Sequence, residues 1–539
     1  MPSSLRSLAG WGRTNATTAE VLELPNHEVP AAMKEAGPRG LLVRGLGRSY
    51  GDAAQNSGGL VLRLLGAAHQ AVIDPVAGTV TVPAGVSIDE LLRVIVPRGY
   101  FVPVTPGTRF VTIGGAIASD IHGKNHHVEG SFGNHVVAVT LLMADGSHMV
   151  VGPTQQPALF WATVGGMGLT GVILDATVRL LPIETSRMSV DTSRIPDLDT
   201  LFTEMSEGDD DYRYSVAWID PQAKGRSLGR SVLSRGDHAR LDQLSPKDAS
   251  DPLGYGAKQL VSMPPLVPPM GVINHATVAA FNELWYRKAP LARKDELQTI
   301  AAFFHPLDMV GKWNRIYGHQ GMLQYQFVVP FGEETTMRTV IERLSASGTA
   351  SFLAVLKRFG AGNQAPLSFP APGWTLAVDV PAGSKGLGDM LHGLDRLVLD
   401  AGGRHYFAKD SHTSPEAIRR GYPRLAEWKA VRDAADPNNF VISWNAVDGA
   451  LDHYNVSVFQ NGVDNVTVVP AGTTIPGTAR RQGHARVQWQ PGAWRFALEA
   501  TGVGEVGVDD TGRERAPGHV VANVEAARTW RFARGTLHA

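Results

Sequence analysis

Small residues and titratable residues stand next to each other between positions 106 and 127. Gly107, Gly114 and Gly115 leave the backbone bare, so it can approach a flat or anionic ligand with no Cβ atom in the way. His122 and Lys124 follow directly. This combination suits a site in which a cofactor ring lies flat against the chain and a proton must move. A Gly-rich turn in a large α/β protein is the alternative explanation for the stretch taken alone.

Two more glycine-rich stretches belong to the same part of the chain. Residues 44–52 follow an expected short buried strand at residues 41–43. Successive free N–H groups in such a turn can bind a pyrophosphate. The glycine spacing differs from the Rossmann fingerprint and no helical pattern follows. Residues 161–173 hold the third cluster, which leads into another expected strand.

Composition limits the class of protein. The chain has 539 residues, of which 43% are hydrophobic and 19% charged, as in ordinary globular proteins of several domains. A formal net charge of −1 gives no overall attraction for nucleic acid. The absence of cysteine excludes disulfides, thiolate chemistry and Cys-ligated metals. We expect neither a secretory signal in the first residues nor a membrane span, since no long apolar run occurs.

Periodicity places the elements that surround these loops. Residues 79–82 predict a strand, and residues 87–98 predict a helix with a capping box formed by Ser87 and Glu90. Residues 136–143 and 172–181 are further expected strands. From residue 184 to about 400 we interpret the pattern as strands with polar spacers. Four prolines within residues 263–270 interrupt it, either as a mobile apolar flap or as a packed surface linker.

The motifs together resemble the FAD-binding domain of flavoproteins of the vanillyl-alcohol-oxidase type. That resemblance is carried by residues 45–50, 106–108, 114–117, 122–125 and 165–171. More specifically, the chain resembles the decaprenylphosphoryl-β-D-ribose 2′-oxidase family, from about residue 10 to about residue 440. The residues that carry this second resemblance are 44–56, 106–136, 283–288, 305–309, 323–327, 363–370 and 408–411.

The resemblance implies an α+β fold in three segments. An FAD-binding domain covers residues 10–183, a substrate domain built on an antiparallel sheet covers 184–400, and residues 401–440 return to the FAD-binding domain. Residues 441–539 depart from the family. Period-2 stretches at 441–444, 454–458, 466–469 and 494–500 predict strands of a small all-β sandwich, similar to a fibronectin type III module that closes at 502–504. A spacer or adhesive role is the default for this module.

The resemblance also implies which side chains do the chemistry. Oxidation of a secondary alcohol by a flavin needs a hydride acceptor, a group that takes the hydroxyl proton, and positive charge near the reduced ring. His122 is expected beside the flavin, as general base, as substrate-orienting group or only as a hydrogen-bond partner of the cofactor. Lys409 is expected to reach the substrate and the flavin edge. Candidates for sugar and phosphate contacts are Lys124, Gln324, Gln326 and Lys357.

The cofactor is expected to be FAD, held without a covalent bond, because residues 47–50 contain no histidine for attachment. Ala377 stands where some relatives have a cysteine facing the flavin. No metal is expected, because the histidines near the site have no carboxylate at metal-ligand spacing. The implied cofactor-binding residues are Val43, Arg44, Gly45, Leu46, Gly47, Arg48, Ser49, Tyr50, Gly51, Asp52, Ala53, Gly107, Thr112, Ile113, Gly114, Gly115, Ser119, Asp120, Ile121, His122, Ile173 and Tyr406.

The implied activity is oxidation of the ribose 2′-hydroxyl of decaprenylphosphoryl-β-D-ribose to the 2′-keto sugar, the first half of epimerisation to the arabinose form used for cell-wall arabinan. It implies a separate NADH-dependent reductase, and a peripheral location at the inner membrane of the cell envelope. One alternative is an alditol or aldonolactone oxidase that passes electrons to oxygen. The other is a flavin-binding cell-surface interaction protein whose working part is the C-terminal module.

Overall fold

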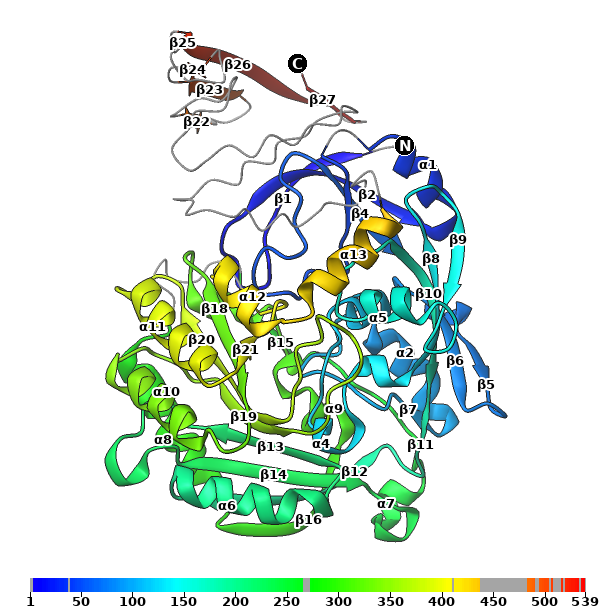
Figure 1. Ribbon diagram of the computed structural model, residues 1–539, viewed down its shortest axis with the longest axis vertical. Helices are drawn as coiled ribbons and strands as arrows, with labels where there is room; N and C mark the ends of the chain where they lie inside the picture. Colours follow the sequence, from blue (N-terminus) through cyan, green and yellow to red (C-terminus); the bar gives the residue numbers. More distant parts are fainter. Residues whose placement is uncertain are drawn as a thin grey trace. The chain divides into compact units, whose positions relative to one another are not determined.

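The computed structural model describes residues 3–36, 39–264, 272–409 and 412–436 with their side chains, and the backbone of strands between 482 and 538. Contacts divide the chain into two units, Met1–Ala446 and Val447–Ala539. The first unit contains two sheets at its N-terminal end and a large sheet that follows (Figure 1). All predicted site residues belong to this unit.

The first sheet has four strands in the order β1-β2-β4-β3, with β2, β4 and β3 parallel. Helix α1 (Val29–Lys34) packs beside it through Val29, Ala32 and Met33. The predicted strand at residues 41–43 is confirmed as β3, and the glycine-rich loop follows its carboxyl end. The strands are β1 (Ser4–Leu8), β2 (Thr17–Pro25), β3 (Leu41–Val43) and β4 (Leu60–Leu65).

The second sheet is antiparallel, with the order β5-β6-β10-β8-β9. Its interior face packs against α2 (Ile88–Ile95) and α3 (Ile113–Ala118), whose apolar residues share one core with the sheet. Helix α5 (Pro157–Thr163) precedes the third glycine cluster. The strands are β5 (Val72–Asp74), β6 (Thr79–Pro83), β8 (Val136–Leu142), β9 (His148–Val151) and β10 (Val172–Arg179).

The predicted helix and its capping box are confirmed. Ser87 accepts from the Glu90 backbone, and the Glu90 carboxylate accepts from the Ser87 backbone at 2.8 Å. The predicted strands at 79–82 and 136–143 are also confirmed, within a residue. The expectation of one strand over 172–181 is wrong at its end: β10 stops at Arg179, and β11 (Leu181–Pro182) pairs instead with β7 (Tyr100–Phe101).

The large sheet has eight antiparallel strands in the order β16-β12-β14-β13-β19-β20-β18-β21. The strands are β12 (Arg187–Ile195), β13 (Tyr214–Ile219), β14 (Ser231–His238), β16 (Ala292–Thr299), β18 (Met322–Val329), β19 (Ala354–Phe359), β20 (Gly373–Pro381) and β21 (Arg404–His405). Strand pairing therefore continues beyond residue 400, where the sequence suggested a domain boundary.

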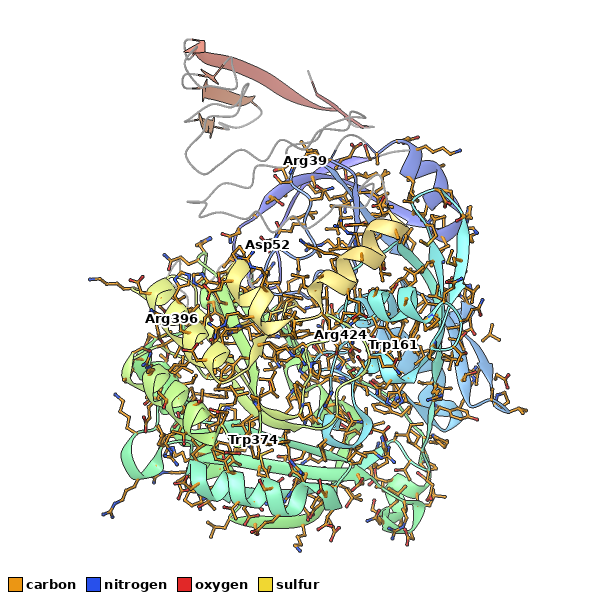
Figure 2. The ribbon with its side chains drawn as sticks, viewed as in Figure 1. Arg39, Asp52, Trp161, Trp374, Arg396 and Arg424 are labelled. Atoms are coloured by element: carbon orange, nitrogen blue, oxygen red, sulfur yellow. The ribbon has the colours of Figure 1, made fainter. Side chains whose placement is uncertain are left out.

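Residues 184–400 contain helices as well as strands, which the strand-and-spacer interpretation overlooked. Helix α6 (Leu198–Gly208), α10 (Glu334–Ala346) and α11 (Leu387–Asp400) cover one face of the sheet (Figure 1). In α10 the buried residues Met337, Val340, Ile341 and Leu344 have helical spacing. Trp374 fills this layer, where its ring packs on Phe202 of α6 (Figure 2).

The remaining helices and strands of this unit connect these layers. They are α4 (His126–Glu129), α7 (Pro246–Ala249), α8 (His275–Lys288), α9 (Ile300–Phe304), β15 (Val261–Ser262), β17 (Val310–Gly311), α12 (Pro415–Gly421) and α13 (Leu425–Ala435). Trp428 of α13 donates to the Ala162 carbonyl of α5 at 2.9 Å, so the chain returns to its N-terminal half. Of the proline-rich stretch, Pro265 to Met270 lie outside the described residues.

The second unit contains a four-stranded antiparallel sheet in the order β22-β23-β26-β27, and a short pair β24–β25. The predicted strand at 494–500 is confirmed within β23. The predicted strands at 441–444, 454–458 and 466–469 lie outside the described residues, so the fibronectin-like sandwich stays a prediction. The strands are β22 (Gln482–Trp489), β23 (Trp494–Val503), β24 (Val506–Gly507), β25 (Arg515–Ala516), β26 (His519–Phe532) and β27 (Gly535–His538).

Candidate active site

Alternation along the central strands of the large sheet separates two kinds of side chain. Tyr325 and Phe327 of β18, like Leu376 and Val378 of β20, point into the core under the helices. The residues between them point to the other side. We call this side the site face, and it carries Gln324 and Gln326 of β18, Lys357 and Phe359 of β19, and Thr375, Ala377 and Asp379 of β20.

His122 meets the site face from the loop that follows α3. Its Nε2 lies 3.0 Å from the Gln326 amide nitrogen, and its ring packs against Phe359 and Tyr406 with centroids 4.9 and 5.2 Å away. An amide nitrogen only donates, so Nε2 is the accepting atom and Nδ1 carries the hydrogen. Nδ1 is buried and has no hydrogen-bond partner among the described residues. His122 thus presents a donor to whatever occupies the site.

Burial determines the charge of His122. Desolvation, helped by the nearby cationic Lys357, holds its pKa well below the usual 6.5. The imidazole is therefore neutral at physiological pH. With Nε2 already occupied, this geometry favours the orienting role over the general-base role.

Lys409 and two tyrosines complete the central group. The Lys409 Nζ lies 3.9 Å from the ring centroid of Tyr50, a cation–π contact. The Tyr50 hydroxyl in turn accepts from the Gln324 amide at 3.3 Å. Tyr406 donates to the Ser119 carbonyl at 2.8 Å and stacks on Phe369. The structure thus brings His122, Lys409, Gln324, Gln326, Tyr50 and Tyr406 together, as predicted from distant parts of the sequence.

Asp379 was missed by the sequence analysis. It is fully buried and stands opposite Gln324 in the β18–β20 register, where it accepts from the Gln324 amide. Burial raises its pKa to about 7, while burial lowers the pKa of Lys409 to about 7. A lone acid in the otherwise apolar run of residues 374–381 was the signal that could have found it.

Lys124 and Lys357 are partly buried bases near the same site. Desolvation lowers the pKa of Lys124 to about 7 and that of Lys357 to about 8. Lys124 donates to the Phe303 carbonyl and lies over the Phe303 ring. Desolvation and Lys357 also lower the pKa of His126 to about 3. Desolvation thus disfavours the charged form of both partly buried amines, and an anion bound beside them would favour it.

Asp120 has a different role from the one that its position in the motif suggested. Its carboxylate accepts from Ser131 at 2.7 Å, from Asn363 at 2.8 Å, from Ser368 and from the Gly133 backbone. These donors occupy both oxygens. The side chain therefore joins two loops of the protein, and only its backbone remains a candidate for cofactor contact.

The loop at residues 44–52 is held open by its own contacts. Arg44 donates to the carbonyls of Ala9 and Ala54, so its side chain supports the loop. A Cβ at Gly45 would lie 2.5 Å from the Thr112 hydroxyl, and Gly47 has φ of 63°, which glycine adopts without strain. Arg48 stacks over Trp11 at 3.9 Å, and its buried Nε has no partner among the described residues.

The stretch from Thr112 to Ser119 forms α3. Thr112 caps the helix by accepting from Gly115 at 3.2 Å. Ile113 and Ile121 are core residues, as is Ile173 of β10, so any contact they make with a ligand is apolar. Around a Cβ built at Gly107 no heavy atom of the described residues lies within 4 Å. Bare backbone, open space at Gly107 and unpaired buried donors at His122 and Arg48 fit a large flat anionic ligand such as FAD.

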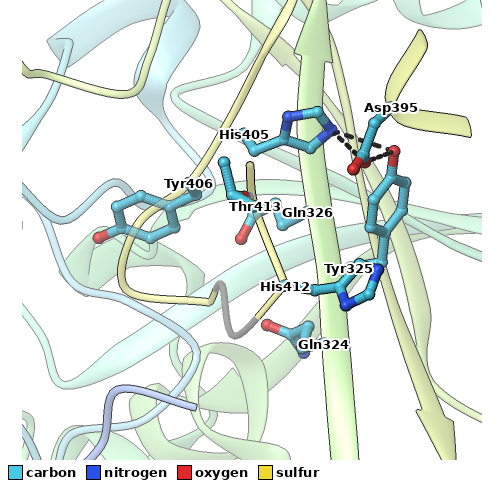
Figure 3. Close-up of a pocket in the computed structure, with 8 residues that line it drawn as sticks. All are labelled: Gln324, Tyr325, Gln326, Asp395, His405, Tyr406, His412 and Thr413. Carbon is cyan, nitrogen blue, oxygen red and sulfur yellow. Dashed lines mark hydrogen bonds and ion pairs between the residues drawn. The ribbon is translucent and has the colours of Figure 1, made fainter. Parts of the chain in front are cut away.

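A small cavity of about 20 Å³ lies beside this group (Figure 3). Gln324, Gln326 and Tyr406 border it, and the triad of Tyr325, His405 and Asp395 stands on its other side. Tyr325 lies 2.9 Å from Asp395 and 3.0 Å from His405. The space that the described residues leave there is about that of one water molecule.

The described residues contain no cluster of three or more His, Cys, Asp or Glu side chains that could bind a metal ion. None of their helices combines the length and apolar character needed to cross a bilayer.

The chain is similar to known flavoproteins. Residues 26–152 match the family model described as FAD binding domain. A decaprenylphosphoryl-beta-D-ribose oxidase from Mycolicibacterium smegmatis is 48% identical over 450 residues, which cover 82% of this chain and 97% of that protein. The chain belongs to the decaprenylphosphoryl-β-D-ribose oxidase family.

Other relatives match a smaller part of the chain. A D-arabinono-1,4-lactone oxidase from Yarrowia lipolytica is 27% identical over 177 residues, 33% of this chain and 31% of that protein. An alditol oxidase from a Streptomyces species is 28% identical over 178 residues, 33% of this chain and 42% of that protein. These two matches cover about a third of the chain, whereas the similarity to the decaprenylphosphoryl-beta-D-ribose oxidase spans both the FAD-binding half and the large sheet.

Replacing Asp120 by alanine should lower the free energy of unfolding by about 3 kcal/mol, because three buried donors and the partly buried Asn363 lose their acceptor. Urea denaturation followed by tryptophan fluorescence measures the change. Asp145→Ala, in an exposed turn where the carboxylate accepts from the Ser147 backbone at 2.8 Å, is the matched control and should leave the free energy of unfolding nearly unchanged. Equal losses in the two variants would contradict the joining role of Asp120.

Proposed function

We propose that this protein oxidises the ribose 2′-hydroxyl of decaprenylphosphoryl-β-D-ribose to the 2′-keto sugar with FAD as its cofactor. The observation that carries the proposal is the similarity to a decaprenylphosphoryl-beta-D-ribose oxidase, 48% identical over 97% of that relative. The region of similarity includes both parts of the site, the glycine-rich loops and the site face. When bound, FAD supplies the acceptor for the hydride of the carbinol carbon.

His122 and Lys409 act on the reacting group. His122 orients the hydroxyl that is oxidised by donating from Nδ1 to its oxygen, since Nε2 is held by Gln326. The hydroxyl proton leaves to solvent as the hydride leaves the carbinol carbon. Lys409, in its protonated form, supplies positive charge where negative charge develops during hydride transfer. Gln324 and Gln326 contact the sugar, and the amines of Lys124 and Lys357 bind the phosphate. Both amines are desolvated, so an anion restores their charge.

FAD is held by the backbone of residues 43–53 and 107–122 without a covalent bond. Support comes from residues 47–50, Gly-Arg-Ser-Tyr, none of which can attach a flavin as histidine does. Arg48 supplies an unpaired buried nitrogen at this loop, suited to a phosphate oxygen. The keto sugar passes to a separate NADH-dependent reductase, because epimerisation requires that a hydride be returned. The product serves cell-wall arabinan synthesis.

The protein is peripheral to the inner membrane, because a decaprenyl tail must remain in a lipid phase. Helix α8 supports this location. Its Asn282 is buried and donates to Asp220, whereas Phe281, Leu284 and Trp285 are 41%, 68% and 43% exposed. Arg287 and Lys288 follow in its last turn. Exposed aromatic and aliphatic residues beside basic ones are typical of helices that lie in a membrane interface.

The alternative of an alditol or aldonolactone oxidase has less support, since those relatives match about a third of the chain, 33% in both cases. A cell-surface interaction protein with a vestigial flavin domain would not need a buried group of His122, Lys409 and paired glutamines. For the C-terminal unit, a spacer or adhesive role beside this activity stays a prediction.

Lys409→Ala should reduce the rate of flavin reduction by decaprenylphosphoryl ribose about 100-fold, as expected when one electrostatic stabiliser is lost. Anaerobic stopped-flow absorbance measures it in protein with equal FAD content. His122→Ala should slow the same step, and Lys409→Arg should recover part of the rate because it keeps the charge. Lys247→Ala, on the exposed helix α7, is the control. An unchanged rate in Lys409→Ala would end the assignment for this residue.

Acid precipitation should release the flavin into the supernatant, because no covalent bond retains it. The visible spectrum of the protein solution before precipitation, compared with that of the supernatant afterwards, measures the released fraction. Flavin that remains with the pellet after washing in denaturant would contradict non-covalent binding.

Changing both Leu284 and Trp285 to serine should weaken binding to vesicles of phosphatidylcholine and phosphatidylglycerol about tenfold, since two apolar side chains lose their lipid contact. Cosedimentation measures the bound fraction. Val76→Ser is the control and should bind normally, because it changes an apolar residue that is 97% exposed in the turn between β5 and β6, away from α8 in the sequence. Equal binding by all three proteins would place the membrane contact elsewhere.

A further inference from the structure

We propose that Asp379 is a positioning residue, which keeps the Lys409 side chain in its charged form and directed at the substrate. The consequence for catalysis rests on the proposed function, whereas the effect on Lys409 itself does not. Asp379 has no hydrogen bond to His122 among the described residues and is joined to Tyr50 through the Gln324 amide, so its action passes through Lys409 and Gln324.

The position of Asp379 is set by the sheet. Its backbone stands opposite Gln324 in the β18–β20 register and donates to the Leu353 carbonyl at 3.0 Å. One carboxylate oxygen accepts from the Gln324 amide. The other is buried and has no hydrogen-bond partner among the described residues. A fully buried carboxylate with a single neutral donor needs a nearby cation to remain charged.

Lys409 is that cation. Of the charged groups that face Asp379, Lys409 stabilises its ionised form, and Asp379 in turn favours the ammonium form of Lys409. Lys357 of β19 opposes the charge on Lys409 by repulsion. Tyr50 and Tyr317 also face Asp379, but burial raises the pKa of both phenols well above 10, so they stay neutral.

Gln324 ties the pair to the substrate side of the site. Its amide nitrogen donates both to Asp379 and to the Tyr50 hydroxyl, and the Tyr50 ring lies under Lys409. This arrangement holds the ring, the amide and the ammonium in fixed relative positions. Burial raises the pKa of Asp379 and lowers that of Lys409, and the opposite charge of each group favours the charged form of the other.

The direct test is the titration of Lys409 in the full-length protein with its FAD. Acetic anhydride reacts with the neutral amine only, so the acetylation rate of Lys409, measured by peptide mass spectrometry across pH, gives its midpoint. Lys288 in the same sample is the internal standard. In Asp379→Asn the midpoint should fall by about one pH unit, because the anion that raises the pKa of Lys409 is gone.

Three variants make the result specific. Asp379→Glu keeps the charge and should restore the midpoint toward that of the unchanged protein. Asp379→Ser repeats the loss of charge with a smaller side chain, should the asparagine variant not fold. Asp395→Asn removes a buried carboxylate on α11, under the opposite face of the sheet, and should leave Lys409 unchanged. An unchanged midpoint in the folded Asn or Ser variant would overturn the proposal.

Turnover separates this inference from the proposed function. If charged Lys409 is needed, activity is present below the pKa of Lys409 and lost above it, so the basic limb of kcat should move to lower pH in Asp379→Asn. A shifted Lys409 midpoint without any oxidation of decaprenylphosphoryl ribose by the unchanged protein would refute the proposed function and leave the role of Asp379 standing. Normal turnover by the unchanged protein, with neither the Lys409 midpoint nor the basic limb of kcat shifted in Asp379→Asn, would refute the role of Asp379 and leave the proposed function standing.

Discussion

The burial of polar groups between the glycine-rich loops and the site face is the constraint on which the rest of the structure depends. His122 meets Gln326 there, and Asp120 meets Asn363 and Ser368. Each contact joins residues that are more than two hundred positions apart in the sequence. Separation of the two halves would leave buried donors and acceptors without partners, which costs more than the bonds themselves contribute. The loops and the sheet are therefore held in one arrangement.

Burial also sets the charges of the site. Desolvation lowers the pKa of His122, Lys124, Lys357 and Lys409 and raises that of Asp379. The charged form of each group is consequently disfavoured relative to the same group in water. In such surroundings an incoming anion or a developing negative charge has a large effect, because water no longer screens it. The same desolvation that weakens the bases makes them responsive to the substrate.

Local patterns in the sequence account for much of the N-terminal half. The capping box of Ser87 and Glu90 marks the start of α2, because both partners lie within one turn. The strands β3, β6 and β8 appear where a short apolar run, apolar alternation and a further strand-like stretch predict them. The same reasoning overlooked α10 and α11, whose helical spacing lies among strands, and it joined β10 to β11 although they belong to different sheets. Which strand a residue pairs with is not visible in its neighbours along the chain.

The candidate site likewise has residues that the sequence predicts and roles that only the structure shows. Family resemblance predicts His122, Lys409, Gln324 and Gln326 as site residues, and the structure brings them together. It could not show that the Asp120 carboxylate is used by the protein itself, that Arg44 supports its own loop, or that Asp379 stands beside Gln324.

The sequence by itself determined the glycine-rich loops, the capped helix and the types of side chain available for chemistry, because these depend on residue identity and short-range spacing. Only the tertiary structure decided the protonation state of each group and its partner. Desolvation and strand register arise when distant segments pack, and no stretch of sequence carries either one alone.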